Sequence, residues 1–203
     1  MRQGRFAFRP GWPLTLIAVA LTALFVRLGF WQLERALQSE SFNATVDERA
    51  SSPVVDLDTG AALPPDVRFR RIHVTGRFEP DKQILLDNQV HESTAGVLVI
   101  TPLKVTNSEV RILVDRGWMP LDPGRQRLPQ PQTPAAEVEV KGVADIPVAP
   151  AFMLGTALQP SSRLWPYLDL PAFERFSGFK VRPFVIRQDQ RDAGGFVRAW
   201  QAP

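Results

Sequence analysis

The sequence predicts a membrane-anchored α+β protein, in which one N-terminal transmembrane helix precedes a β-rich domain built as an antiparallel sheet or a small barrel with short helices. Two observations predict this fold: an apolar run near the start, and a later series of short segments in which Val and Ile alternate with polar residues. A chain of 203 residues has room for an anchor and one globular domain. Its hydrophobic content of 44% and charged content of 22% are typical of a folded protein.

The apolar run covers residues 14–30 and, with its flanks, reaches the roughly 20 residues that a helix needs to cross a bilayer. Trp12 and Trp31 bracket the run, and the helical rise places them about 28 Å apart, close to the thickness of the hydrocarbon core. Tryptophan is enriched at both membrane interfaces. The sequence therefore predicts a transmembrane helix over residues 12–33.

Arginines set the expected direction of this span. Arg2, Arg5 and Arg9 precede it, and a positively charged flank stays on the cytoplasmic side. We therefore expect residues 1–11 to form a cytoplasmic basic tail and residues 34–203 an extracytoplasmic domain. A cleaved signal peptide begins in the same way. The segment after Val26, RLGFWQLERALQ, lacks the small-residue cleavage pattern, which favours an uncleaved anchor.

The net charge of +3 does not indicate a nucleic-acid-binding protein, because the three N-terminal arginines carry it. Without them, 21 Lys and Arg remain from the total of 24 and equal the 21 Asp and Glu. A neutral domain lacks the basic surface that binds phosphate backbones. We therefore expect the lipid bilayer, and no nucleic acid, among the partners.

Beyond the span, periodicity predicts the order of the remaining elements. A helix is expected to continue over residues 31–49 and to end at the Ser-Ser-Pro of 51–53, and residues 53–66 are expected to form a loop. Alternating patterns predict strands at 71–75, 83–87, 96–103, 110–118, 137–141 and 181–187. Asp169 followed by Pro171 predicts a short helix through Phe176. The uncharged segment 146–162 holds three prolines and predicts a loop packed on the sheet, with a membrane-skimming loop as the alternative.

Residue types that carry catalysis or bind metals are scarce. There is no Cys, and His73 and His91 are the two histidines. Neither lies in a nucleophile motif, and with Asp87 and Glu92 nearby they make only a weak metal signal. The pair Asp56 and Asp58 is typical of a solvated edge, as is the pair Glu137 and Glu139. The sequence therefore predicts no enzyme and no metal site, and an extracytoplasmic enzyme remains only as a residual class.

Three blocks place aromatic, Gly, Pro or Arg residues where a packed corner or a binding edge forms: GFWQLER at 29–35, GVLVITPL at 96–103 and VDRGWMP at 114–120. In a helix, Arg27, Trp31 and Arg35 recur at i, i+4 and i+8 and therefore share a face. The alternative for Arg27 is that its side chain reaches up to the lipid headgroups. The candidate partner-binding residues are Arg27, Trp31, Gln32, Arg35, Arg116, Gly117 and Trp118.

In order and spacing, these blocks resemble the surfeit locus protein 1 family, the assembly factors of cytochrome c oxidase. Further blocks share the resemblance: VTGRF at 74–78, LDN at 86–88, LWPY at 164–167 and VRAW at 197–200. The resemblance covers the chain from about residue 12 to its end. It implies a protein of the bacterial inner membrane, with a periplasmic domain, or of the mitochondrial inner membrane.

The resemblance also implies a function: help with haem a insertion or with maturation of the catalytic subunit. The implied partners are cytochrome c oxidase subunit I and other oxidase assembly factors. The implied cofactor is haem a, bound transiently, and the candidate residues would then contact its propionates. The alternative is a cofactor-free structural or accessory subunit that stays in the oxidase complex.

One feature departs from the family pattern. Family members end with a second transmembrane helix that carries a His-x-x-Tyr-Ala-x-Gln-Trp pattern, to which haem ligation is attributed. This sequence stops at Pro203 without that pattern, so the resemblance transfers haem ligation neither to His73 nor to His91. A reading frame that continued into a second apolar span would restore that role.

Overall fold

The computed structural model describes residues 11–50, 52–58, 63–122, 124, 127–148, 163–189 and 195–198, although not the side chains of 36–47 and 50. The chain divides into two compact units, residues 1–45 and 46–203. The first holds the apolar helix and the second holds the strands.

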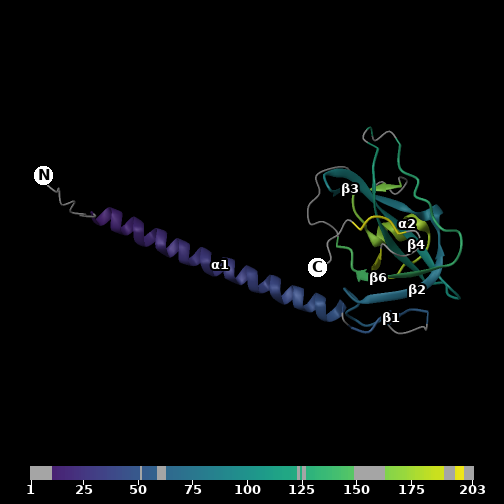
Figure 1. Ribbon diagram of the computed structural model, residues 1–203, viewed down its shortest axis with the longest axis horizontal. Coiled ribbons are helices and arrows are strands. Elements are labelled where there is room, and N and C mark those ends of the chain that lie inside the picture. Colours follow the sequence, from purple (N-terminus) through teal and green to yellow (C-terminus); the bar gives the residue numbers. More distant parts are fainter. Residues whose placement is uncertain are drawn as a thin grey trace, which may run out of the picture. The chain divides into compact units, whose positions relative to one another are not determined.

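Helix α1 (Trp12–Ala50) is continuous over 39 residues, as the unbroken ribbon in Figure 1 shows. Its part from Trp12 to Arg35 is long and apolar enough to cross a membrane, and its large side chains are exposed. The helix continues to the predicted stop before Ser52, which confirms the predicted extension. The predicted end of the span at residue 33 stays a prediction, because the backbone passes through that position without a break.

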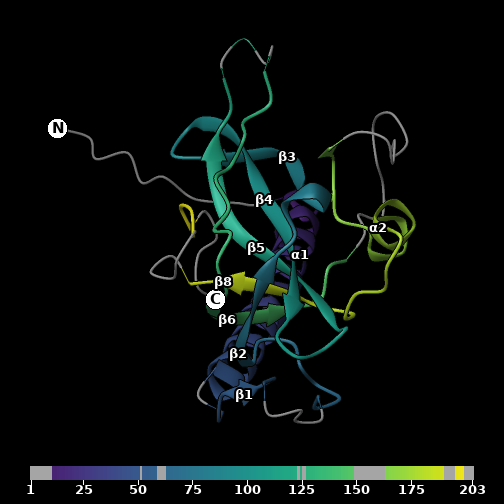
Figure 2. The same cartoon turned by 90° about the vertical axis from the view of Figure 1, so that its right-hand side faces the viewer.

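A closed five-stranded barrel forms the centre of the second unit. Around the ring the order is β2, β6, β8, β5, β4, and pairing of β2 with β4 closes it (Figure 2). The closing pairs join Gly76 to Val105 and Phe78 to Leu103. These strands are β2 (Arg71–Phe78), β4 (Thr94–Val105), β5 (Arg111–Pro120), β6 (Val138–Asp145) and β8 (Val185–Gln188).

Three further strands extend this ring. The longer of them is β3 (Ile84–His91), which pairs with the first half of β4, and β7 (Leu164–Trp165) pairs with β3. On the other side, β1 (Val55–Asp56) pairs with β2. A 3-10 turn, η1 (Pro80–Lys82), connects β2 to β3. The pairings β1–β2, β3–β7 and β5–β8 are parallel, so the sheet is mixed. Of the two predicted forms, an antiparallel sheet or a small barrel, the barrel is the one observed.

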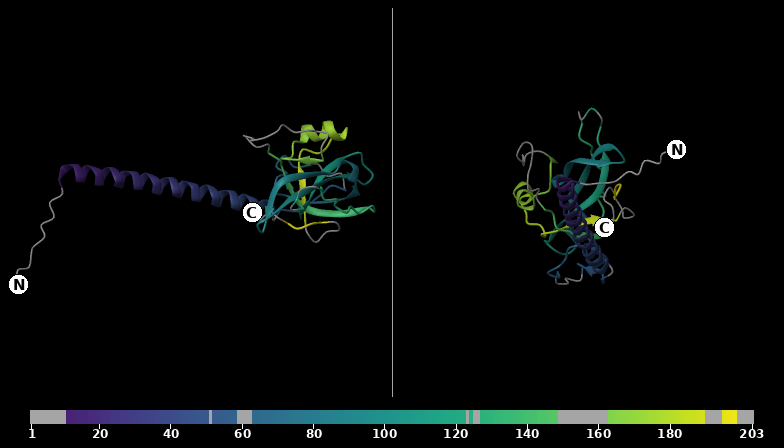
Figure 3. Two further views of the ribbon diagram at one scale, coloured as in Figure 1. Left: turned by 90° about the horizontal axis from the view of Figure 1, so that it is seen from above. Right: turned by 90° about the vertical axis from the view of Figure 1, so that its left-hand side faces the viewer.

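Alternation along the strands separates three hydrophobic clusters in the described part of the chain, two of which are large. Ile72 and Val74 of β2 point inward with Ile112 and Val114 of β5, and they fill the barrel. A second cluster lies outside the barrel wall, where α2 (Leu170–Ser177) packs against the strands (Figure 3). Its centre is Trp165, in edge contact with Phe173 and Phe176.

Some observed elements differ from the prediction, and the short strand β7 was not predicted. The strand expected at 181–187 begins only at Val185, because Pro183 has no N–H to donate to a sheet. Residues 53–66, expected to be a loop, contain the two-residue strand β1. Of the expected loop at 146–162, residues 149–162 lie outside the described part of the chain.

Candidate functional site

A β-bulge in β5 forms the centre of the candidate site. Asp115 pairs with Ile100 of β4, and Trp118 pairs with Leu98, so β5 has one residue more than its partner between these pairs. Gly117 absorbs the extra residue with a φ of +111°, in the left-handed region that glycine adopts without steric cost. The DRGW sequence is therefore the bulge itself.

The segment 195–198 covers this bulge. The Phe196 N–H donates to the Arg116 carbonyl at 2.6 Å, and the Trp118 N–H donates to the Val197 carbonyl at 2.7 Å. A Cβ added to Gly117 would lie 2.7 Å from the Val197 carbonyl oxygen. Glycine is therefore required here for two reasons, the backbone conformation and the close approach of the segment.

Arg116 is fully buried between two aromatic rings. Its guanidinium carbon lies 4.9 Å from the ring centres of both Phe78 and Phe196. The guanidinium also donates to the Gln132 carbonyl at 2.6 Å and to Thr133 Oγ1 at 2.8 Å. Burial lowers the pKa of Arg116 to about 10, so the side chain keeps its charge at neutral pH.

Asp115, the residue before Arg116 in the sequence, is a buried carboxyl. Its Oδ1 accepts the N–H of Gly117 at 3.1 Å. Burial raises the pKa of Asp115 to about 7; the Gly117 N–H and Arg187 act in the opposite direction, and Asp145 adds to the increase. The bulge therefore holds a group that changes charge near neutral pH.

The indole of Trp118 joins the bulge to the β3–β4 hairpin. Its Nε1 donates to the Gln89 carbonyl at 3.3 Å, and its ring lies 5.3 Å from that of His91. A Cβ on Gly96 would overlap the indole, so the glycine makes room for it. In β3, Asn88 has a φ of 59° where the register with β4 shifts. Three sequence blocks, at 86–88, 96–103 and 114–120, thus meet at one place together with residues 197 and 198.

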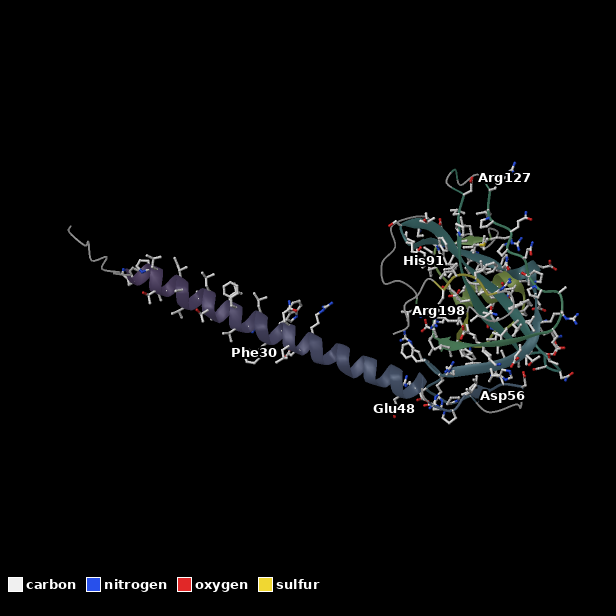
Figure 4. The ribbon with its side chains drawn as sticks, viewed as in Figure 1. Phe30, Glu48, Asp56, His91, Arg127 and Arg198 are labelled. Atoms are coloured by element: carbon white, nitrogen blue, oxygen red, sulfur yellow. The ribbon has the colours of Figure 1, made fainter. Side chains whose placement is uncertain are left out.

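The predicted site residues fall into two groups. Arg27, Trp31, Gln32 and Arg35 are exposed on α1, and the Arg35 guanidinium lies 5.9 Å from the centre of the Trp31 ring, which places both on one face. Figure 4 shows the Phe30 side chain of the same helix turned outward. The other group, Arg116, Gly117 and Trp118, lies inside the domain under the segment 195–198.

Comparison with known proteins decides the family. The model of the SURF1 family matches residues 19–203. The chain belongs to the SURF1 family. A SURF1-like protein of Rickettsia bellii is 28% identical over 88% of this chain and 72% of its own length. The Surfeit locus protein 1 of Xenopus tropicalis is 27% identical over 88% of this chain and 61% of its own. An uncharacterized SURF1-like protein of Mycobacterium bovis is 34% identical over 66% of this chain and 52% of its own.

The two histidines, which could in principle act as axial haem ligands, both have other contacts in the described part of the chain. His73 lies between two carboxylates, with Nε2 2.7 Å from Glu139 and Nδ1 3.4 Å from Asp56. His91 belongs to the β3–β4 hairpin and packs on Trp118. Both imidazoles thus already contact other side chains.

Several neighbours of the candidate site were not predicted. The rings of Phe78 and Phe196 and the amide of Gln83 surround Arg116, although they are 38, 80 and 33 residues away in sequence. Nothing local marks these partners. Asp56, Asp58 and His73 also come together, with potential ligand atoms within 4.8 Å of one another. Asp56 and Asp58 are close in sequence, but their approach to His73 depends on the pairing of β1 with β2.

Proposed function

We propose that this chain is a non-catalytic assembly factor for haem-a-containing cytochrome c oxidase, and that it promotes haem a insertion or maturation of the catalytic subunit. Membership in the SURF1 family, known for oxidase assembly, carries this proposal. The match begins inside α1 and includes the barrel, so both the apolar helix and the domain belong to the shared architecture.

The proposal places α1 across the inner membrane, with the N-terminus in the cytoplasm and the barrel domain in the periplasm. The apolar helix and the arginines that precede it support this direction. In this position the domain works next to the part of the oxidase that lies at the outer membrane surface. Cytochrome c oxidase subunit I and other assembly factors are the proposed partners.

We assign partner or haem-propionate contact first to Arg27, Trp31, Gln32 and Arg35. Their side chains are exposed, and a guanidinium pairs with two oxygens of a carboxylate at once. A contact through Arg116 or Trp118 would require the segment 195–198 to move away from β5.

Gene deletion followed by complementation tests the proposal. A strain that depends on this oxidase should lose haem a absorbance and oxidase activity, and the wild-type chain should restore both. The double variant Arg27→Ala/Arg35→Ala should restore them only in part. Arg175→Ala is the matched control, because Arg175 is an exposed helical arginine of α2 and should restore both fully.

Two outcomes would contradict this function. Unchanged haem a absorbance and activity after deletion would refute a role in assembly. Recovery of the chain in stoichiometric amounts with the mature enzyme would instead support the accessory subunit, because an assembly factor should purify mainly with intermediates.

A further inference from the structure

A cavity of about 530 Å³ lies on the outer face of the barrel, over β2, β6 and β8. On β2 the residues that fill the barrel alternate with residues that face outward, toward this cavity. Four cationic side chains line it, and they come from β2, β6, β8 and the segment 195–198: Arg71, Lys141, Arg187 and Arg198. Figure 4 labels Arg198 of this lining. The fold therefore gathers positive charges that are far apart in the sequence.

Strand pairing places three of these cations around one apolar side chain. Val143 of β6 is opposite Arg71 of β2 and also opposite Arg187 of β8. Opposite residues project from the same face of a sheet, and adjacent strands are about 4.8 Å apart, so the backbones at the two arginines are about 10 Å apart. Lys141 precedes Val143 by two residues and shares its face. An anion above Val143 is therefore within reach of all three side chains.

Carboxylates also line the cavity, but they are fewer than the cations. Within the described part of the chain they are Asp56, Glu139 and Asp189. Glu139 lies 2.8 Å from Lys141 Nζ and 2.7 Å from His73 Nε2, and Asp56 lies 3.4 Å from Nδ1 of the same imidazole. Exposed ion pairs of this kind contribute little stability, so Lys141 can also contact a ligand. The cavity thus has a local positive excess.

Two guanidiniums of the cavity have donor groups that an anion would satisfy. Arg71 is exposed, and its side chain makes no hydrogen bond or ion pair within the described part of the chain. Arg198 makes other interactions, but its Nε is buried and donates no hydrogen bond to the described residues. A buried donor is costly unless a water or a ligand accepts a hydrogen bond from it. Arg187, in contrast, is already held by Asp145 at 2.5 Å.

We propose that this cavity binds a phosphate group, with Arg71 and Arg198 as donors and the other two cations close to its charge. The oxygens of a phosphate accept hydrogen bonds from donors on several elements, whereas a planar carboxylate matches the fork of one arginine. Val54 and Val143 add apolar surface, which suits a phosphate joined to an apolar body such as a lipid. Free phosphate is the other source of the same group. The site does not depend on the proposed function.

Titration of the full-length chain in a nonionic detergent tests this site. The probes are dihexanoyl phosphatidate, inorganic phosphate and dihexanoyl phosphatidylcholine, and isothermal titration calorimetry measures each dissociation constant. We expect one saturable site for phosphatidate, and at least about tenfold weaker binding of phosphatidylcholine, whose net charge is zero. Tighter binding of phosphatidate than of inorganic phosphate would identify a lipid as the source, and equal affinity would identify free phosphate. Both results support a phosphate site.

Arginine variants of β2 separate the cavity from the general charge of the domain. Arg71→Ala should weaken phosphatidate binding at least about tenfold, because it removes a charge-assisted hydrogen bond. Arg71→Lys should lose less, because the charge remains. Arg77→Ala is the matched control and should bind like the wild type, since Arg77 is an exposed arginine of the same strand that does not line this cavity. Both arginines are exposed, so the circular dichroism spectrum should stay unchanged.

Three results would overturn the phosphate site. One is the absence of a saturable site for both phosphatidate and phosphate in the wild type. The others are equal affinity of the wild type and Arg71→Ala for phosphatidate, and equal affinity of the wild type for phosphatidylcholine and phosphatidate. Oxidase assembly in the deletion strain is a separate measurement, so the two proposals can fail independently.

Discussion

Gly117 allows β5 to form its bulge, and a side chain at this position would have two unfavourable effects, one on the backbone conformation and one on a close contact. An alanine would have to adopt a φ of +111° and would place its Cβ 2.7 Å from the Val197 carbonyl. Both effects destabilise the native state, and we expect Gly117→Ala to lower the free energy of unfolding by about 2–3 kcal/mol. Thermal unfolding of the detergent-solubilised chain measures this change.

Gly178 supplies the matched control. It also has a positive φ, of 82°, but a Cβ there would meet no atom within 4 Å. Gly178→Ala should therefore cost only the conformational part, about 1 kcal/mol. Equal losses in the two variants would show that the segment 195–198 does not press on Gly117.

Asp115 predicts a pH dependence of stability. Its pKa is 3.8 in an ordinary environment and about 7 in the folded protein, so the native state binds more protons between these values. The resulting stabilisation is complete below about pH 4 and is lost as pH rises through 7. Asp115→Asn cannot ionise. Its stability relative to the wild type should therefore increase from pH 5 to pH 8 by at least about 1.4 kcal/mol, the equivalent of one pKa unit.

The measurement is a pair of melting curves for each protein at pH 5 and pH 8. In a chain of this size, a change of about 1.4 kcal/mol in relative stability corresponds to a shift of about 3–5 °C in the difference between the two Tm values. The same change at the exposed Asp122 should leave the pH dependence of the wild type intact. Parallel curves for the wild type and Asp115→Asn would contradict the inference that the buried carboxyl is protonated at pH 5.

At the scale of elements, helix α2 depends on Asp169, the residue that precedes it. The Asp169 side chain accepts the N–H of Ala172 at 2.7 Å and thereby caps the helix. Asp169→Ala should lower the free energy of unfolding by about 1 kcal/mol, whereas Asp169→Asn should stay close to the wild type because Asn caps equally well. Urea unfolding followed by Trp fluorescence is a suitable measurement, since Trp165 packs against α2. A large loss with Asn would indicate a role of the charge other than capping.

The longer elements were predicted and the two-residue strands were not, because only the longer elements have a local sequence pattern. The alternation of β2 and the capping of α2 are local, so residues close in sequence show them. The strands β1 and β7 have two residues each, and their pairing with β2 and β3 creates them. No periodicity exists in two residues.

At the scale of the whole molecule, the apolar helix predicts the behaviour of the chain toward lipid. The protein should remain in the membrane pellet after alkaline carbonate extraction, and its intact mass should include residues 12–33. Arginine in the middle of a span costs about 2.5–3.5 kcal/mol, so Leu21→Arg/Leu24→Arg should move the chain into the soluble fraction.

Leu128→Arg is the control for added charge. Leu128 is an exposed leucine of the barrel domain, 41% accessible, and its substitution should leave the chain in the pellet. A wild-type protein that is recovered in solution without residues 12–33 would support the cleaved signal peptide instead of an anchor.

The candidate site was predicted from the sequence only in part. The blocks at 96–103 and 114–120 were recognised as unusual, and the structure brings them together at Gly96 and Trp118. The block at 114–120, expected to form a packed corner or a binding edge, forms an internal bulge. Burial of Arg116 depends on Phe196, 80 residues later, and a contact at that distance leaves no local pattern.

The apolar helix, the main strands and the family follow from the order of the residues, because hydrophobic periodicity and motif order are properties of neighbouring residues. Closure of the strands into a barrel, burial of Asp115 and Arg116, and the approach of His73 to Asp56 and Asp58 become visible only in the folded chain. These outcomes depend on which strand edges pair, and strand pairing joins residues that are far apart in sequence.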